Sequence, residues 1–134
     1  MLNRRSSGLS RTTPLPRRTA PLARASGGCR AERGRQGVAY RIVDEAAEAG
    51  CLACGCAGPL DHSHCLTQKQ WPAHRNNPVN IHLECRRCHE KWENNKHAYA
   101  RQYPAAWAAK MAVMQQLEPS YYAFFRMKNP TLPK

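Results

Sequence analysis

The sequence predicts a small α+β domain that a bound metal ion stabilises and that follows a basic, disordered arm. Three observations lead to this fold class: a chain of 134 residues, seven cysteines, and an apolar pattern that changes between helical and strand periods. A domain of this size buries little apolar surface, so it usually needs an additional source of stability. The cysteines are candidate metal ligands, because thiols in a reducing compartment bind metal more often than they form disulfides.

Residues 1–36 form the expected disordered arm. They contain nine arginines and one acid, so they carry +8 of the total charge of +12 and leave +4 for the remainder. A seven-residue unit occurs twice, as RTTPLPR at 11–17 and RTAPLAR at 18–24, and its prolines exclude a continuous helix. Such an arm can neutralise DNA phosphates without folding, whereas a mitochondrial transit peptide and a solvated tail are the alternatives. The arginines expected to contact DNA are Arg11, Arg17, Arg18 and Arg24.

Residues 37–129 form the expected folded domain, and residues 130–134 form a short tail. Apolar residues at helical spacing predict helices at about 37–49 and 88–100. They also predict C-terminal helices within about 104–128, the last of them a short helix in SYYAFFRMKN with Ser120 as its cap. The apolar stripe of the first helix consists of Val38, Ile42, Val43 and Ala46. The stripe expected to pack in the core consists of Trp107, Met111, Met114 and Leu117.

The stretch NIHLEC alternates with a period of two and therefore predicts a short strand. Ile81 and Leu83 are expected to face the core, and His82 and Glu84 are expected to face solvent.

Two C-x2-C pairs, separated by thirty residues, predict a structural zinc site. The expected ligands are Cys51 and Cys54 from the first pair and Cys85 and Cys88 from the second. Four thiolates complete a tetrahedral site, so this zinc would stabilise the fold and would not take part in catalysis. Cys56 is an alternative ligand near the first pair, but the two-residue spacing favours Cys54.

Several polar residues between the two pairs are not needed for a zinc site. They are Asp61, His62 and His64 in the run DHSH, Asn80 before the second pair, and His89 directly after it. Side chains of these types can take a proton from water and can bind a hard cation. Histidine suits the first task, and a carboxylate with an imidazole suits the second.

The order of these motifs resembles the HNH, or ββα-metal, nuclease family in its zinc-containing form. The D-x-S-H run and the R-x-x-P-L-x-R repeats are similar to the phage recombination nucleases of the Ref and NinG type. The resemblance covers about residues 51–97 and 9–24. It implies a zinc-stabilised ββα-metal core with flanking helices and a metal-dependent endonuclease that acts on DNA in phage-type recombination or DNA processing.

The resemblance also assigns roles to individual residues. It makes Asp61 and His89 ligands of a catalytic Mg²⁺ or Mn²⁺ ion, and it makes Asn80 the residue that orients the base. It further implies a host recombinase as a candidate partner and the cytoplasm of a bacterial or phage-infected host cell as the location.

Two histidines compete for the role of the base. If the family's adjacent D-H pair is mapped, the base is His62, and if the D-x-S-H form is mapped, it is His64. We favour His64, because Cys65 and Leu66 follow it and can anchor the strand in the core. His62 would then be a second metal ligand or a phosphate contact. Because Asp61 faces away from His64 on an ideal strand, this assignment requires a bend or bulge.

The loop TQKQWPAHRNNPV is expected to contact DNA through Lys69 and Arg75, with Trp71 either stacking on a base or packing in the fold. No apolar run approaches the roughly 20 residues that span a bilayer, so no membrane helix is expected. We also expect no small-molecule cofactor. The alternative function is a non-catalytic zinc-ribbon protein that binds nucleic acid.

Overall fold

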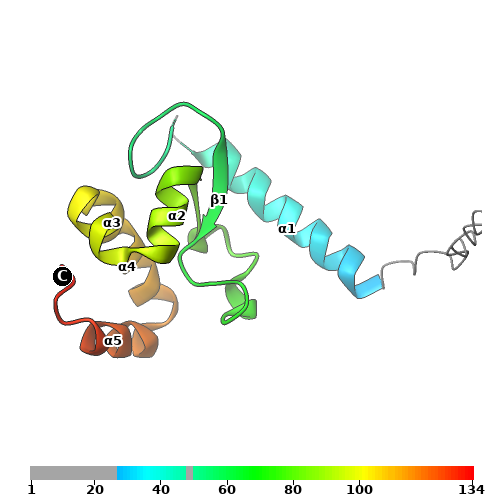
Figure 1. Ribbon diagram of the computed structural model, residues 1–134. Coiled ribbons are helices and arrows are strands. Elements are labelled where there is room, and N and C mark those ends of the chain that lie inside the picture. Colours follow the sequence, from blue (N-terminus) through cyan, green and yellow to red (C-terminus); the bar gives the residue numbers. More distant parts are fainter. Residues whose placement is uncertain (1–26, 48–49) are drawn as a thin grey trace, which may run out of the picture.

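The computed structural model describes residues 27–47 and 50–134 and shows five helices and a two-stranded antiparallel sheet (Figure 1). This architecture confirms the small α+β class. The elements are, in chain order, α1 (Gly27–Ala46), β1 (Leu60–His64), the 3₁₀ turns η1 (Pro72–His74) and η2 (Pro78–Asn80), β2 (Ile81–Cys85), α2 (Arg86–Asn94), α3 (Lys96–Gln102), α4 (Pro104–Leu117) and α5 (Pro119–Lys128). Within the described ranges, no helix is long and apolar enough to cross a membrane.

Helix α1 begins at Gly27, well before the expected start near residue 37. Residues 27–36 are therefore helical, and the expectation that they belong to a disordered arm is wrong. The apolar stripe is also less buried than expected, since Val38 and Ile42 are 53% and 47% exposed. The four arginines of the repeats lie outside the described residues.

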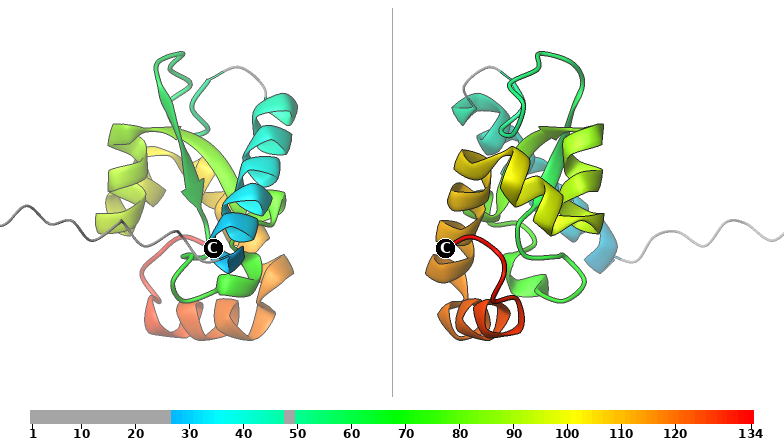
Figure 2. Two further views of the ribbon diagram at one scale, coloured as in Figure 1. Left: turned by 90° about the vertical axis from the view of Figure 1, so that its right-hand side faces the viewer. Right: turned by 60° about the vertical axis from the view of Figure 1, so that its left-hand side comes forward.

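Strands β1 and β2 pair residue for residue, with Asp61 opposite Glu84, His62 opposite Leu83 and His64 opposite Ile81. The bend or bulge that our assignment of the base required is thus not present in this ladder. Neighbouring residues of a regular strand point to opposite faces, so His62 and His64 share one face and Asp61 lies on the other. Figure 2 shows the two strands between α1 and α2, which cover the two sides of the sheet.

The helix expected at about 88–100 is two helices. Asn95 separates them, and its side chain accepts a hydrogen bond of 3.1 Å from the backbone N–H of Ala98. This contact is a typical N-cap, which satisfies one of the free N–H groups at the start of α3. Helices α4 and α5 each begin with proline, which fits the first turn because it lacks the N–H that would have no partner there.

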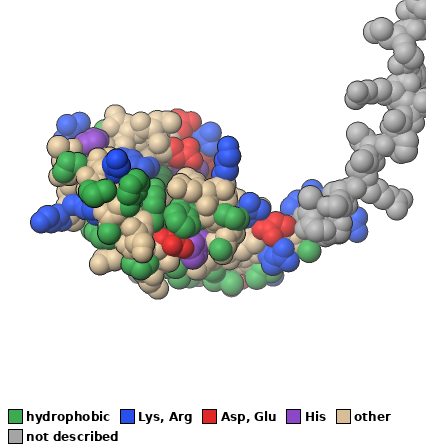
Figure 3. Space-filling model, turned by 90° about the horizontal axis from the view of Figure 1, so that it is seen from below, with side chains coloured by type: hydrophobic (Ala, Val, Ile, Leu, Met, Phe, Trp, Pro, Cys, Tyr) green, Lys and Arg blue, Asp and Glu red, His purple; other side chains and the backbone are tan. Residues whose placement is uncertain are grey.

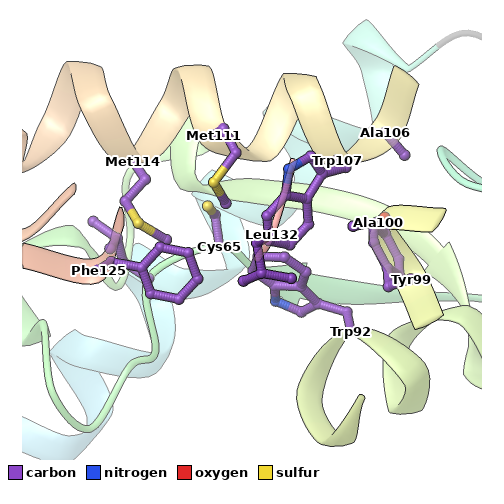
Figure 4. Packing of buried hydrophobic residues seen from close by; sticks show 11 residues of the cluster. Cys65, Trp92, Tyr99, Ala100, Ala106, Trp107, Met111, Met114, Phe125 and Leu132 are labelled. Atoms are coloured by element: carbon purple, nitrogen blue, oxygen red, sulfur yellow. The ribbon is translucent and has the colours of Figure 1, made fainter. Parts of the chain in front are cut away.

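The hydrophobic core lies on the inner side of α4, as the apolar stripe predicted. Trp107, Met111 and Met114 are at most 4% exposed, and Leu117 is partly buried. Figure 4 shows that the side chains of Trp107, Met111 and Met114 point from α4 toward a layer formed by other segments. That layer includes Cys65, Trp92, Phe125 and Leu132.

Glu84, on the expected solvent-facing side of β2, is buried, and side chains from α3 and α4 contact it there. Glu84 is fully buried, and its Oε2 lies 3.1 Å from Nζ of Lys110, which is fully buried as well. Tyr99 donates a hydrogen bond to the same carboxylate. His82, also expected at the surface, is mostly enclosed, and burial lowers its pKa to about 4. The charge of Glu84 is tolerated in the interior because the opposite charge of Lys110 is buried beside it.

Candidate metal centre and histidine site

Four cysteine thiols converge where the segment before β1 meets the end of β2. The Sγ atoms of Cys51, Cys54, Cys56 and Cys85 lie within 4.8 Å of one another, and those of Cys54 and Cys85 are 3.7 Å apart. A tetrahedral zinc with Zn–S bonds of about 2.3 Å places its sulfur ligands roughly 3.8 Å apart. The cluster therefore has the chemistry and the spacing to bind a metal such as zinc.

Two glycines allow the first half of this cluster to form. Gly50 and Gly55 have φ angles of 110° and 74°, which other residues rarely adopt. A Cβ atom on Gly50 would also lie 2.7 Å from the carbonyl oxygen of Gly55. The turn is closed by the N–H of Gly55, which donates to the carbonyl of Cys51, and by the N–H of Cys51, which donates to the carbonyl of Cys56.

Backbone N–H groups favour the thiolate form of two members of the cluster, Cys54 and Cys85. The hydrogen bond from the backbone of Cys56 lowers the pKa of Cys54 to about 6, and the backbone of Cys88 likewise lowers the pKa of Cys85. Because the thiolate is the metal-binding form, both shifts favour a bound cation.

The structure differs from the predicted ligand set in one member. Cys56 belongs to the four-thiol group, whereas Cys88 lies beside it, fully buried and near the thiols of Cys85 and Cys54. Burial raises the pKa of Cys88 to about 12, and the hydrogen bond with the thiol of Cys54 raises the pKa of Cys56 to about 11, so geometry and not thiol acidity separates the two. The tight turn at Gly55 explains the difference, because it brings Cys56 back toward Cys51.

Asp61 and His89 come together between β1 and α2. Oδ2 of Asp61 lies 3.6 Å from Nδ1 of His89, which is buried and has no hydrogen-bond partner among the described residues. Two ligand atoms about 2.1 Å from one octahedral cation are roughly 3.0 Å apart or more, so this separation fits a shared ion. Arg86 Nη1 also lies 3.4 Å from this Oδ2, and Nε2 of His89 lies 3.1 Å from Oε1 of Glu93.

Both ring nitrogens of His64 contact the protein. Nε2 donates a hydrogen bond of 3.0 Å to the carbonyl oxygen of Arg75, so Nδ1 carries the lone pair. Nδ1 lies 3.3 Å from Nε2 of Gln68, which can donate to it. Burial lowers the pKa of His64 and thereby favours the neutral imidazole.

His62 contacts α1 instead. Its ring stacks on that of Tyr40, with centroids 3.9 Å apart and planes 2° from parallel. Its Nε2 lies 2.8 Å from Oδ1 of Asp44 and donates a hydrogen bond to this carboxylate. Neither contact was predicted from the sequence, although Gln36, Tyr40 and Asp44 are spaced by four residues and so share one face of α1.

Asn80 is fully buried and fixes the segment that follows His64. Its Oδ1 accepts a hydrogen bond of 2.7 Å from the N–H of Leu66, and its Nδ2 donates to the carbonyl oxygens of Leu66 and His74. Its backbone carbonyl accepts from the N–H of Cys65. These contacts join the backbone after β1 to the segment before β2, and the orienting role expected for Asn80 stays a prediction.

Replacing Asn80 with alanine is expected to lower the free energy of unfolding by about 2–4 kcal/mol, because buried groups of Leu66 would lose their partners. Urea denaturation of the two proteins measures this difference. Asn77→Ala is a matched control, since Asn77 accepts a bond from Val79 at an exposed turn and should cost only about 1 kcal/mol. Equal losses in the two variants would contradict the bracing role of Asn80.

A cavity of about 460 Å³ brings the three histidines together. His62, His64 and His89 line it with Glu93, and Lys69 and Lys96 add two positive side chains. Further lining residues are aromatic, including Trp71, Trp92, Tyr121 and Phe125. The cavity therefore combines imidazoles, ammonium groups and apolar surface.

The two loop cations have different surroundings. Lys69 is exposed at the cavity, whereas Nη1 of Arg75 lies 3.6 Å from a carboxylate oxygen of Glu32 in α1. Trp71 packs on Tyr121, with ring centroids 5.1 Å apart, so the structure places it at the edge of the core. On the face shown in Figure 3, Lys and Arg side chains stand among hydrophobic and neutral ones.

Comparison of this chain with protein-family models, curated proteins and solved structures gives no match. The function proposed below is therefore based on the geometry of the site itself.

Proposed function

We propose that the protein is a metal-dependent endonuclease that hydrolyses DNA phosphodiester bonds. The observation that carries the proposal is the buried Nδ1 of His89, which has no hydrogen-bond partner among the described residues and lies 3.6 Å from the carboxylate of Asp61. His89 also lines the same cavity as His62 and His64. A carboxylate, a free imidazole nitrogen and a nearby base are the groups that such a hydrolysis needs.

In the proposed reaction, one of the two strand histidines takes a proton from water, and the water oxygen attacks phosphorus in line with the leaving 3′ oxygen. Asp61 and His89 would hold Mg²⁺ or Mn²⁺, which when bound supplies charge neutralisation at the phosphate. The cysteine cluster would hold zinc and fix the β1–β2 unit. Lys69 and the arm arginines Arg11, Arg17, Arg18 and Arg24 are proposed to contact DNA phosphates.

A role in phage-type recombination or DNA processing, with a host recombinase as partner, is proposed from the motif resemblance alone. The same resemblance is the basis for proposing the cytoplasm as the place of action.

The second candidate function is a non-catalytic nucleic-acid-binding protein. A net charge of +12 and a cluster of four thiols support it. A protein that only binds nucleic acid has no need for the buried Nδ1 of His89 next to the carboxylate of Asp61, so we place this function second.

A plasmid-nicking assay with Mg²⁺ or Mn²⁺ tests the proposal. We expect cleavage by the wild type and a loss of about 100-fold or more in His89→Ala and Asp61→Asn, because both remove a ligand of the cation. His97→Ala is the matched control, since His97 is exposed and bonds only Thr131 among the described residues. A wild type that binds DNA but does not cleave it with either metal would support the non-catalytic alternative.

A further inference from the structure

One face of helix α1 carries a polar stripe that points toward β1. Its members are Gln36, Tyr40 and Asp44, one helical turn apart. Nε2 of Gln36 donates to the hydroxyl of Tyr40 at 2.9 Å and lies 3.3 Å from Oε1 of Gln68. The stripe thus forms a connected set of polar contacts next to the two strand histidines.

Two members of the stripe fix the ring of His62. Stacking on Tyr40 at 3.9 Å sets the plane of the imidazole, and the carboxylate of Asp44 at 2.8 Å sets its rotation within that plane. A carboxylate only accepts hydrogen bonds, so Nε2 carries the proton and Nδ1 carries the lone pair. Nδ1 has no hydrogen-bond partner among the residues that the structure describes, and His62 lines the cavity.

His64 has a different arrangement. Its Nε2 is bound to the carbonyl of Arg75 and its Nδ1 faces the amide of Gln68, so a water molecule would have to displace a protein contact to reach either nitrogen. Of the two strand histidines, His62 is therefore the one that combines a fixed tautomer with a free lone pair. A carboxylate behind an imidazole also stabilises the positive charge that the ring gains when it accepts a proton.

We propose that Asp44 and Tyr40 are positioning residues for His62 and that His62, rather than His64, is the general base. This inference rests on the proposed nuclease function. In the reaction, an O–H bond of water breaks and its proton goes to Nδ1 of His62, while the water oxygen bonds to phosphorus. The P–O3′ bond breaks, the 3′ oxygen takes a proton from solvent, and His62 later returns its proton to solvent. Helix α1 is then part of the active site.

The first test is the nicking assay with added imidazole. His62→Ala is expected to lose about 100-fold or more in rate, and exogenous imidazole should restore part of it, because general-base catalysis typically contributes 10²–10⁴-fold. His64→Ala should lose less, and imidazole should not restore it. Recovery by imidazole in His64→Ala but not in His62→Ala would overturn the choice of base.

The second test addresses Asp44. Asp44→Ala should lower kcat about 10-fold with little change in KM, and Asp44→Asn, which keeps an acceptor oxygen but not the charge, should recover only part of the loss. Glu45→Ala is the matched control, because Glu45 is the next acid on α1 and is exposed. Wild-type kcat in Asp44→Ala would overturn the positioning role.

Nitrogen-15 NMR of the histidine rings keeps the two proposals separate. We expect His62 to be in the Nε2–H tautomer in the wild type and in a mixture of tautomers in Asp44→Ala. An inactive wild type with this tautomer change would refute the nuclease and the base while supporting the contact with Asp44. An active wild type whose His62 signal is the same in Asp44→Ala would refute the positioning role alone.

Discussion

Serine at Cys51, Cys54 or Cys85 is expected to abolish zinc binding and to unfold the domain. These three thiols belong both to the predicted ligand set and to the converging cluster, and they join the segment before β1 to the end of β2. Small domains bind structural zinc with an apparent free energy of about 10–16 kcal/mol, which is comparable with the whole stability of a domain, about 5–15 kcal/mol. Loss of a ligand therefore removes most of the stability.

Zinc content by atomic emission and thermal unfolding by circular dichroism measure this effect. The wild type should contain one zinc per chain and lose its melting transition when a chelator removes the metal. Cys65→Ala is the matched control. Cys65 packs in the hydrophobic core and is not a member of the thiol cluster, so this variant should bind as much zinc as the wild type. Full zinc content and normal melting in Cys54→Ser would contradict the structural site.

The fourth ligand can be identified in the same experiment. Cys56→Ser and Cys88→Ser separate the set seen in the structure from the set that the C-x2-C spacing predicts. The cluster geometry leads us to expect the larger zinc loss in Cys56→Ser. The opposite order would show that the second C-x2-C pair binds as a unit and that Cys56 is a neighbour of the site.

Local patterns predicted those features of the fold that depend on neighbours in sequence. The spacing of apolar residues located the core face of α4, and the spacing of cysteines identified three members of the thiol cluster. Cys56 was not chosen because its place depends on the positive φ of Gly55, which a spacing rule does not contain. The same rule gives no information on which thiol a tight turn brings closer.

Contacts between distant segments could not be predicted in this way. His62 meets Asp44 because α1 packs along the sheet, and Asp61 meets His89 because α2 packs on β1. Period-two alternation correctly placed Asp61 and His64 on opposite faces of the strand, but it could not show that helices cover both faces. For that reason Glu84 was expected at the surface and is buried.

Strand β1 is therefore supported from both sides. On one side, α1 contacts His62 through Tyr40 and Asp44. On the other side, Ser63 is fully buried, and its Oγ lies 3.4 Å from Nζ of Lys110. Because Ser63 separates the two strand histidines in the chain, the ion pair behind it helps to fix their positions.

The second large effect is expected at this buried ion pair. Lys110 lies 3.1 Å from Glu84 and over the ring of Trp92, 4.6 Å from its centroid, and both charged side chains are fully buried. Lys110→Met should lower the free energy of unfolding by about 3–5 kcal/mol, because it leaves the carboxylate of Glu84 without a compensating charge. For a domain of about 100 residues, this corresponds to a fall in Tm on the order of 12–25 °C.

The pH dependence of stability should change as well. Burial alone would raise the pKa of Glu84, but Lys110, together with hydrogen bonds from Tyr99 and Ser63, outweighs burial and lowers it. A lowered carboxyl pKa contributes stability that is present above the pKa of the unfolded chain and is lost as the pH falls through the folded pKa. In Lys110→Met this contribution should disappear, so the variant should lose less stability than the wild type on acidification.

The double variant Lys110→Met/Glu84→Gln is the control that separates charge from packing. It removes both charges while a glutamine oxygen can still accept from Tyr99, so it should recover much of the stability that Lys110→Met loses. Urea denaturation of the wild type, both single variants and the double variant gives the coupling energy directly. Additive losses would mean that the two side chains do not interact, and β1 would then lack its support on the side of α4.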